Sequence, residues 1–500
     1  MSERRLQFLL RWEQILISVG IVVLALLLAA AWGWSIASGG LIALLVRLLP
    51  VAVVGGLVAL LLAARPFVAL CLQVAVLTTA PLLRVYLPVG SIPLYVGDML
   101  LGLALVGAIW QYRQTGLRPS FRLVNICLVG FTLAILISSM VLATTVGGAI
   151  QVVYAVARYV LSTVGLFGAA IWLARTPDQQ RLLCGIVLFG AAINATLSIM
   201  QNLPGIQVIG AQIPRFLYGA RSVPDFRYEM ILAGEYQRGF GLYQSATALS
   251  GVLAMAVVFC LMAGKTLLKR NLWVYLLAML LLTGMLATYS RHAILSLALV
   301  AIVGFFTLPN IRALLRMTTA LAVIGAFALT VGLVDLDYLT SRSEVLLEDE
   351  STFARVNGLV AFAEYTIEQP QRVLIGNGIG WSDLRDRGLI STRETNLLTG
   401  GFVSNAYPLI AYNIGILGLV SYLTLFGYVL YQSIRHARRL RGNHRADLLL
   451  GLAATLLTAA IVHPFDNYFS ESTEVRSLFW FLMGLTTSVL VTVVKEAHQS

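Results

Sequence analysis

Four arginines in this chain have side chains whose chemistry suits the binding of anionic groups: Arg158, Arg238, Arg291 and Arg355. A guanidinium group is permanently charged, and its planar fork of N–H donors matches the oxygens of a phosphate or a carboxylate. Several such groups around one cavity would form a clamp for a diphosphate. The elements that carry these arginines decide whether they can meet.

Composition indicates that those elements are membrane helices. Hydrophobic residues make up 59% of the 500 residues, and charged residues only 12%. A soluble protein of this size does not carry such a balance. We therefore expect an all-α, polytopic bundle of about 12 to 14 transmembrane helices, each crossing roughly 30 Å of hydrocarbon. The apolar runs lie at about 14–36, 40–63, 66–81, 94–111, 122–143, 148–174, 180–201, 243–264, 271–288, 290–308, 311–333, 405–432, 447–463 and 475–495.

The distribution of charge predicts the orientation of these helices. With the N-terminus in the cytoplasm, basic clusters such as KTLLKR (265–270) and RHARRLRGNHR (435–445) all fall on the cytoplasmic side, and few acidic residues join them. This agrees with the positive-inside rule. The net charge of +12 therefore reads as an orientation signal, and nucleic-acid binding is not needed to explain it. We expect a multi-pass protein of a bacterial cytoplasmic membrane with both termini in the cytoplasm.

The domain organisation is predicted to be simple. Residues 1–500 are expected to form a single integral-membrane domain with two long extracytoplasmic loops, at 202–242 and 334–404. Long ordered loops tend to carry function. The four cysteines lie inside apolar runs, where small buried hydrophobic side chains are expected, and they suggest neither a disulfide nor a metal site.

Three charged residues fall inside predicted spans, where a charge is unfavourable by at least a few kcal/mol. At 1.5 Å per residue, Arg47, Asp98 and Arg158 lie roughly 10, 6 and 15 Å below the outer surface. An ion pair between Arg47 and Asp98 that holds two helices together is the simplest account of those two. No acidic residue is predicted at the depth of Arg158, which favours a functional role. Tyr154, one turn earlier, extends the same polar face.

The other predicted site residues lie at the outer boundary. Arg238 precedes one apolar helix and Arg291 begins another, where arginines can also act as snorkelling anchors. In the larger loop, Arg355 falls in the first turns of a predicted amphipathic helix that ends before Pro370. The following IGNGIGW stretch includes Gly378, where the backbone can turn sharply and point its amides at an anion or a sugar.

Four strings carry a family resemblance: RGFGLYQSATALSG (238–251), YSRHAILSLAL (289–299), ARVNGLVAFAEYTIEQPQRVLIGNGIGW (354–381) and SNAYPLIAYNIGILGLVSYL (404–423). Their order and spacing, with the long loop between them, resemble the O-antigen ligase and polymerase superfamily over about residues 150–490. The resemblance implies a metal-independent, inverting glycosyltransferase of the GT-C class that needs no cofactor. Such an enzyme transfers a glycan from an undecaprenyl-diphosphate donor to an acceptor hydroxyl at the outer face of the membrane.

The resemblance also implies roles for particular residues. Arg238 and Arg291 correspond to the diphosphate-binding arginines of the family, and Arg355 to its loop arginine. Asn405 and Tyr407 match a family segment in which a histidine serves as the base toward the acceptor. This chain has Ser404 in place of that histidine, which favours a polymerase over a lipid A core ligase. His292 is a substitute base, because the ordinary pKa of histidine lies near working pH, unless its ring faces lipid or another helix.

The sequence therefore predicts a polysaccharide polymerase whose partners are lipid-linked glycans, membrane lipids and a chain-length regulator. Glu229, Glu235, His463 and Asp466 are weaker candidates for the base. Three alternatives stay open. Transfer of a finished glycan to another acceptor is the nearest. A transporter, of the kind labelled inorganic-carbon transporters, or a lipid flippase would require polar groups through the inner half of the bundle, which is mainly apolar.

Overall fold

In the computed structural model the protein divides into two compact units. The first unit comprises Met1–Leu72 and Met99–Leu117, and the second comprises Gln73–Asp98 and Arg118–Ser500. The structure describes residues 56, 58–81, 83–86, 93–115, 121–146, 149–203, 205–218, 238–243, 245–268, 270–307, 318–319, 321–323, 326, 359–360, 362–379, 406–440, 444–462 and 473–497.

The first unit contains a sharp bend between two apolar helices. A helix over Val58–Ala64 is followed by α3 (Pro66–Thr79) at an angle of 110°. Proline lacks a backbone N–H, so Pro66 ends the preceding helix while it suits the first position of a new one. α4 (Val96–Thr115) enters this unit at Met99. Its Gly107 packs directly against Ala63 and Pro66, which places α4 across the bend.

The second unit is a helical bundle with one short hairpin. The hairpin consists of β1 (Arg84–Tyr86) and β2 (Pro93–Tyr95), which pair antiparallel. The helices are α5 (Arg122–Val146), α6 (Ala149–Val160), the π-helix η2 (Leu161–Gly165), α7 (Leu166–Leu173), α8 (Pro177–Asn202), α9 (Gln207–Tyr218), α11 (Ala246–Leu267), α12 (Asn271–Leu286), α13 (Arg291–Thr307), α17 (Pro370–Ile375), α20 (Ala406–Arg439), α21 (His444–Val462) and α23 (Thr473–Ala497).

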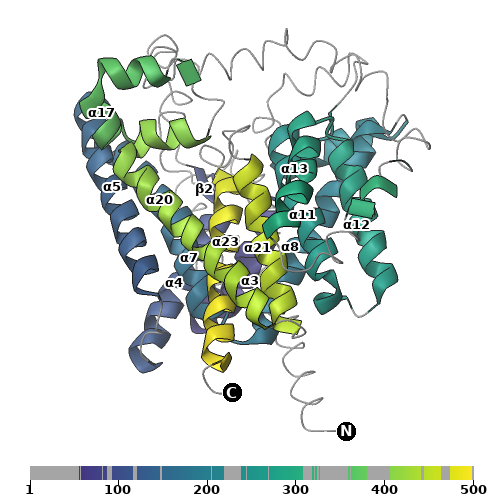
Figure 1. Ribbon diagram of the computed structural model, residues 1–500. Helices are drawn as coiled ribbons and strands as arrows, with labels where there is room; N and C mark the ends of the chain where they lie inside the picture. Colours follow the sequence, from purple (N-terminus) through teal and green to yellow (C-terminus); the bar gives the residue numbers. More distant parts are fainter. Residues whose placement is uncertain are drawn as a thin grey trace, which may run out of the picture. The chain divides into compact units, whose positions relative to one another are not determined.

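Three helices form the centre of the second unit. Of the most apolar window of each helix, 89% is buried in α11, 83% in α23 and 78% in α21, against 39% in α5. α11 packs against α8, α12, α13 and α21, whereas α20 packs against α5, α21 and α23. Figure 1 shows α5 and α20 side by side, with α17 beside the first turns of α20. The exposed apolar side chains of α5, such as Ile126, Val129 and Met140, are what a lipid-facing helix would present.

α8 is the helix on which the site depends, and its boundaries are set locally. Thr176 and Gln179 form a capping box, in which Thr176 Oγ1 accepts from the Gln179 amide (3.3 Å) and Gln179 Oε1 accepts from the Thr176 amide (3.0 Å). At this end Gln180 is buried and donates to Ser488 and Thr492 of α23 (3.2 and 3.1 Å). These contacts fix the start of α8 against α23.

The two ends of the second unit differ in charge and chemistry. We call one end the site end: α8 finishes there, and α11, α13, α20 and α23 begin there. A group of basic residues in connections and in the terminal turns of helices lies at the opposite end: Arg175, Arg181, Lys265, Arg270, His436, Arg438, Arg439 and Lys495. The positive-inside rule places basic connections in the cytoplasm, so this distribution of charge predicts that the site end faces away from it.

The helix prediction agrees with the structure in type. Among the described residues, seven helices are long and apolar enough to cross a membrane, or up to eight if the bent pair counts as one span. Three shorter apolar helices occur at Val96–Gln111, Asn271–Leu286 and Arg291–Gly304. These features are consistent with a polytopic membrane protein. The predicted run at 14–36 and residues 40–55 of the predicted run at 40–63 lie outside the described residues.

Two breaks in the helices were not predicted. The run at 148–174 contains the π-helix η2, in which Ser162 and Thr163 are buried. α20 is interrupted at Gly415, whose backbone has φ 75° and ψ 170°. Both irregularities lie within apolar sequence, where periodicity gives no warning of them.

Candidate functional site

Two irregular segments meet at the site end and carry two of the predicted arginines. One is Arg238–Tyr243, which we call the Arg238 segment, and the other is Ala287–Ser290, the turn between α12 and α13. The amide of Gly239 donates to the carbonyl of Ala287 (3.0 Å), and Nε of Arg238 donates to the carbonyl of Thr288 (2.9 Å). Because Arg291 begins α13 three residues after Thr288, these contacts place the Arg238 segment near the start of α13. The meeting of the two guanidinium groups stays a prediction.

The polar face of α8 holds both segments. Its members are spaced so that they lie on one side of the helix: Asn194, Ser198, Gln201 and Asn202. Toward the Arg238 segment, Gln201 Oε1 accepts from the amides of Phe240 (2.8 Å) and Gly241 (2.9 Å). Asn194 Oδ1 accepts from the amide of Leu242 (2.7 Å). The segment is thus bonded to α8 along most of its length.

The same face of α8 also reaches the helix that leads to Arg291. Ser198 Oγ donates to the carbonyl of Gly284 near the end of α12 (2.9 Å). Asn202 Nδ2 donates to the carbonyl of Ala287 in the turn itself. The last carbonyls of a helix have no hydrogen-bond donor within that helix. Ser198 and Asn202 supply such donors at the end of α12.

Backbone conformation shows how closely these parts are fitted. Gly239 lies so near Ser198 that a Cβ would overlap both its hydroxyl and its backbone. Gly241 has φ 56°, a value that glycine adopts easily. Tyr289 also has a positive φ, 49°, and is the one described non-glycine residue that does. Such a conformation is unfavourable for a tyrosine and persists only where surrounding contacts determine it.

His292 faces the interior of the helix bundle. It is buried, and its ring nitrogens contact two serine hydroxyls: Nδ1 lies 2.9 Å from Ser290 Oγ, and Nε2 lies 3.1 Å from Ser250 Oγ on α11. This geometry fixes the ring between the α12–α13 turn and α11. The predicted role of His292 as a base stays a prediction, but its hydrogen-bonding positions are already used in the structure.

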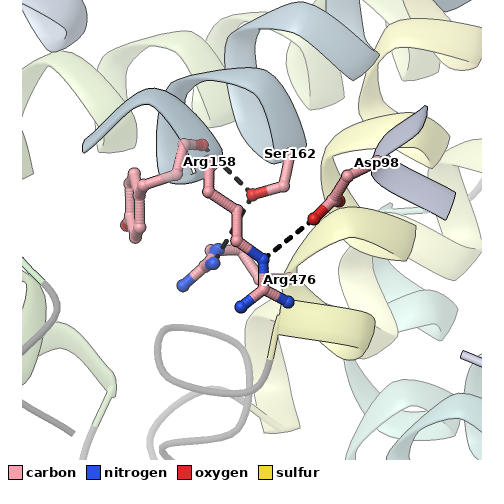
Figure 2. A network of polar contacts seen from close by, with 5 residues as sticks. Asp98, Arg158, Ser162 and Arg476 are labelled. Atoms are coloured by element: carbon pink, nitrogen blue, oxygen red, sulfur yellow. Dashed lines mark hydrogen bonds and ion pairs between the residues drawn. The ribbon is translucent and has the colours of Figure 1, made fainter. Parts of the chain in front are cut away.

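Arg158 lies in a second polar cluster, and the expectation that no acidic residue lies at its depth is wrong (Figure 2). Nε of Arg158 forms an ion pair with Asp98 Oδ2 (2.9 Å), and the guanidinium lies 3.7 Å from the ring centroid of Tyr95. Arg47, the expected partner of Asp98, lies outside the described residues. Asp98 and Tyr95 both flank the start of α4, so Arg158 fastens this junction to α6. Tyr154, one turn before Arg158, is half-buried.

Arg476, at the start of α23, joins the same network and was missed by sequence reasoning. It is buried, its Nη2 donates to Ser162 Oγ (3.4 Å), and its guanidinium lies 4.1 Å from the ring centroid of Tyr159 (Figure 2). Glu474, two residues earlier, is only 4% exposed, and its Oε1 accepts no hydrogen bond from any described residue. The sequence does indicate a polar site here, because TEVRS places two charged residues in the first turn of an apolar helix.

The larger loop is anchored to the break in α20. The amide of Asn377 donates to the carbonyl of Tyr412 (2.9 Å), and the amide of Gly378 donates to the carbonyl of Asn413 (2.8 Å). The amide of Gly378, expected to face a ligand, is therefore used in packing the loop on α20. Asn377 Nδ2 also donates to the hydroxyl of Tyr365 (2.7 Å). Burial raises the pKa of Tyr365, while the Asn377 hydrogen bond and the Arg372 charge oppose the rise, so the phenol is neutral at pH 7.

The remaining predicted residues are placed as follows. Tyr407 is half-buried in the first turn of α20, and its hydroxyl donates to the carbonyl of Ala460 on α21 (3.3 Å). Arg355 and Asn405 lie outside the described residues, as do the weaker candidates Glu229, Glu235, His463 and Asp466. The larger loop also contains Asp335-Leu336-Asp337, a spacing that metal-dependent glycosyltransferases use, and it too lies outside them. Metal independence therefore stays a prediction of the resemblance.

The four cysteines fit their expected role. All are free, and Cys127, Cys184 and Cys260 are buried, while Cys71 is partly buried.

Fold and site together define a class: a helical, multi-span protein in which charged and amide side chains gather at one end of an apolar bundle. No protein-family model matches the chain, and no curated protein matches it.

Proposed function

We propose that the protein is a membrane glycosyltransferase that transfers a glycan from an undecaprenyl-diphosphate donor to a lipid-linked acceptor, and so polymerises a polysaccharide. The observation that carries this proposal is the junction of the Arg238 segment with the α12–α13 turn. Arg238 donates to the turn through Nε, and Arg291 starts the helix that leaves it.

The junction has the electrostatic properties that a diphosphate site needs. A departing diphosphate carries negative charge, and fixed guanidinium groups stabilise that charge without having to reorganise. Arg291 also stands at the first turn of α13, whose N-terminal amides add positive potential toward an anion. The α8 contacts immobilise the backbone on both sides, which keeps the charges in place.

The cluster around Arg158 gives less support to a donor-binding role than the sequence suggested. Asp98 neutralises Arg158, so Arg158 has a structural partner and need not hold the donor. We therefore assign the donor diphosphate to Arg238 and Arg291. Arg355 in the larger loop, as the resemblance implies, would act in positioning donor and acceptor.

Purified protein supplied with an oligosaccharide linked to undecaprenyl diphosphate tests the proposal. A polymerase produces a ladder of products, whereas a ligase adds a single unit to its acceptor. Arg291→Ala is expected to abolish product formation while the protein still inserts and folds, because removing one such charge lowers turnover by about 100- to 1000-fold. Retained turnover by that variant contradicts the diphosphate assignment, and the absence of any glycan product with the unmodified protein contradicts the enzyme class.

A further inference from the structure

We propose that the carboxamide of Gln201 is the positioning group of the diphosphate site: it sets the backbone of the Arg238 segment and thereby aims the Arg238 guanidinium toward Arg291. The inference rests on the proposed function, because it concerns how that same site is built. Gln201 contacts neither the donor nor the reacting atoms, and its effect on the site passes through Arg238.

The hydrogen bonds of Gln201 are complete and are directed at backbone. Oε1 accepts from the amides of Phe240 and Gly241, at 2.8 and 2.9 Å. Nε2 donates to the carbonyls of Gly210 and Gly241, at 3.2 and 3.1 Å. A carboxamide has two acceptor positions and two donor hydrogens, so this side chain is fully used. It is also completely buried, where each such bond is strong and each loss is expensive.

The Arg238 segment depends on this outside support. Within it, the described backbone bonding consists of one turn, in which the Tyr243 amide donates to the Phe240 carbonyl (3.0 Å). The two residues that Gln201 holds follow Arg238 closely, at positions 240 and 241. Since the segment is neither helix nor strand, the direction of the Arg238 side chain is set by whatever fixes those residues.

The other contacts of the segment lead to the same site. Gly239 donates to Ala287, and Asn202 of α8 donates to that same carbonyl. The polar face of α8 thus holds both the Arg238 segment and the α12–α13 turn. Three of the four hydrogen bonds of Gln201 go to the segment that carries Arg238, and the fourth goes to Gly210 of α9.

Gln180 provides a matched control on the same helix. It is also a buried glutamine, 2% exposed, and its carboxamide also bonds to backbone and side chains of other elements. It lies at the opposite end of α8 and contacts α23 instead of the site. Gln201→Met and Gln180→Met both remove a buried carboxamide at nearly constant volume, so they should destabilise the protein similarly.

The test is the affinity of the purified full-length protein for inorganic pyrophosphate, measured by calorimetry in detergent. Gln201→Met should weaken binding by about 10- to 100-fold, the effect of a charge misplaced by about 1 Å, and Gln180→Met should leave it unchanged. In a double-mutant cycle, Gln201→Met should have no further effect once Arg238→Ala is present, because its action passes through that guanidinium. If Gln201→Met does not fold, Gln201→Asn, which keeps the carboxamide but shortens its reach, should show the same dependence on Arg238.

Three results overturn the inference. Unchanged pyrophosphate affinity in a folded Gln201 variant removes the positioning role alone. Additive effects of the Gln201 and Arg238 substitutions remove it as well, since they would show independent contributions. If the unmodified protein does not bind pyrophosphate, the diphosphate site is absent, and the proposed function is contradicted together with the inference.

Discussion

At the scale of single residues, the orientation of a guanidinium matters as much as its charge. Arg238 uses Nε to bond to the Thr288 carbonyl, which leaves its terminal nitrogens directed by that contact. Lysine has no equivalent of Nε, so Arg238→Lys keeps the charge and loses the orientation. We expect turnover to fall about 10-fold or more in the lysine variant, against about 100- to 1000-fold in Arg238→Ala. Initial rates of glycan transfer measure both, and equal rates for lysine and arginine contradict the orientation argument.

Asp98 and Arg158 lead to a prediction about stability. Asp98→Ala leaves the Arg158 guanidinium, 9% exposed, without its ion-pair partner. Removing one partner of such a buried pair destabilises a protein by about 3 kcal/mol. A thermal melt in detergent should show a clear loss for Asp98→Ala and a smaller loss for Asp98→Ala combined with Arg158→Met. If the single variant melts normally but loses glycan transfer, the pair serves the substrate and not the fold.

Whether glycan transfer requires a divalent metal ion also depends on individual side chains. The resemblance implies a metal-independent reaction, and the described site offers guanidinium groups for the diphosphate charge. Glycan transfer should therefore be unaffected by EDTA. Loss of activity that Mg²⁺ or Mn²⁺ restores would contradict this, and would direct attention to Asp335 and Asp337.

The sequence singles out Arg238 and Arg291 because each stands at the edge of an apolar run, and their roles stay predictions. The ion pair between Arg158 and Asp98 could not be predicted, because the two residues are 60 positions apart and their pairing depends on the packing of helices. Arg476 stood in a visible motif, TEVRS, but its contact with Ser162 depends on the π-helix, which leaves no mark in the sequence.

Among the helices, α8 shows that an apolar run can carry a polar face. The run at 180–201 was predicted as a plain span, yet it carries polar residues at 194, 198 and 201, with Asn202 just beyond its end. That spacing places them on one helix face, so their clustering was readable. Their partners were not, because these are backbone groups of irregular segments whose positions follow from the fold alone.

The junction of the larger loop with α20 leads to a prediction about an element. The side-chain Nδ2 of Asn377 donates to the Tyr412 carbonyl of α20 and, within the loop, to the Tyr365 hydroxyl. Asn377→Ala removes both side-chain hydrogen bonds, which should destabilise the junction by about 1–3 kcal/mol. Limited proteolysis of the loop should become faster in this variant. Gln371→Ala, at an exposed position of α17, is the control and should be cleaved at the original rate. Equal rates for both variants would show that the junction does not hold the loop.

At the scale of the whole molecule, the account depends on which end faces outward. The basic last turns of α11, α20 and α23 lie opposite the site end, and the positive-inside rule then places the site end outside the cytoplasm. A cysteine introduced at Ile206, which is 37% exposed at the site end, should react with a membrane-impermeant maleimide in intact cells. A cysteine at the exposed Arg270, in the α11–α12 connection, should react only after permeabilisation. The reverse pattern would place the arginines in the cytoplasm and contradict transfer at the outer face.

The Arg238 segment and the α12–α13 turn are proposed to bring Arg238 and Arg291 to one diphosphate. A cryo-EM structure of the protein with an undecaprenyl-diphosphate-linked oligosaccharide can locate that diphosphate. We expect diphosphate density with oxygens about 3 Å from nitrogens of both guanidinium groups. Diphosphate density elsewhere, or guanidinium groups of Arg238 and Arg291 that turn away from it into lipid, would show that the two arginines do not bind the donor.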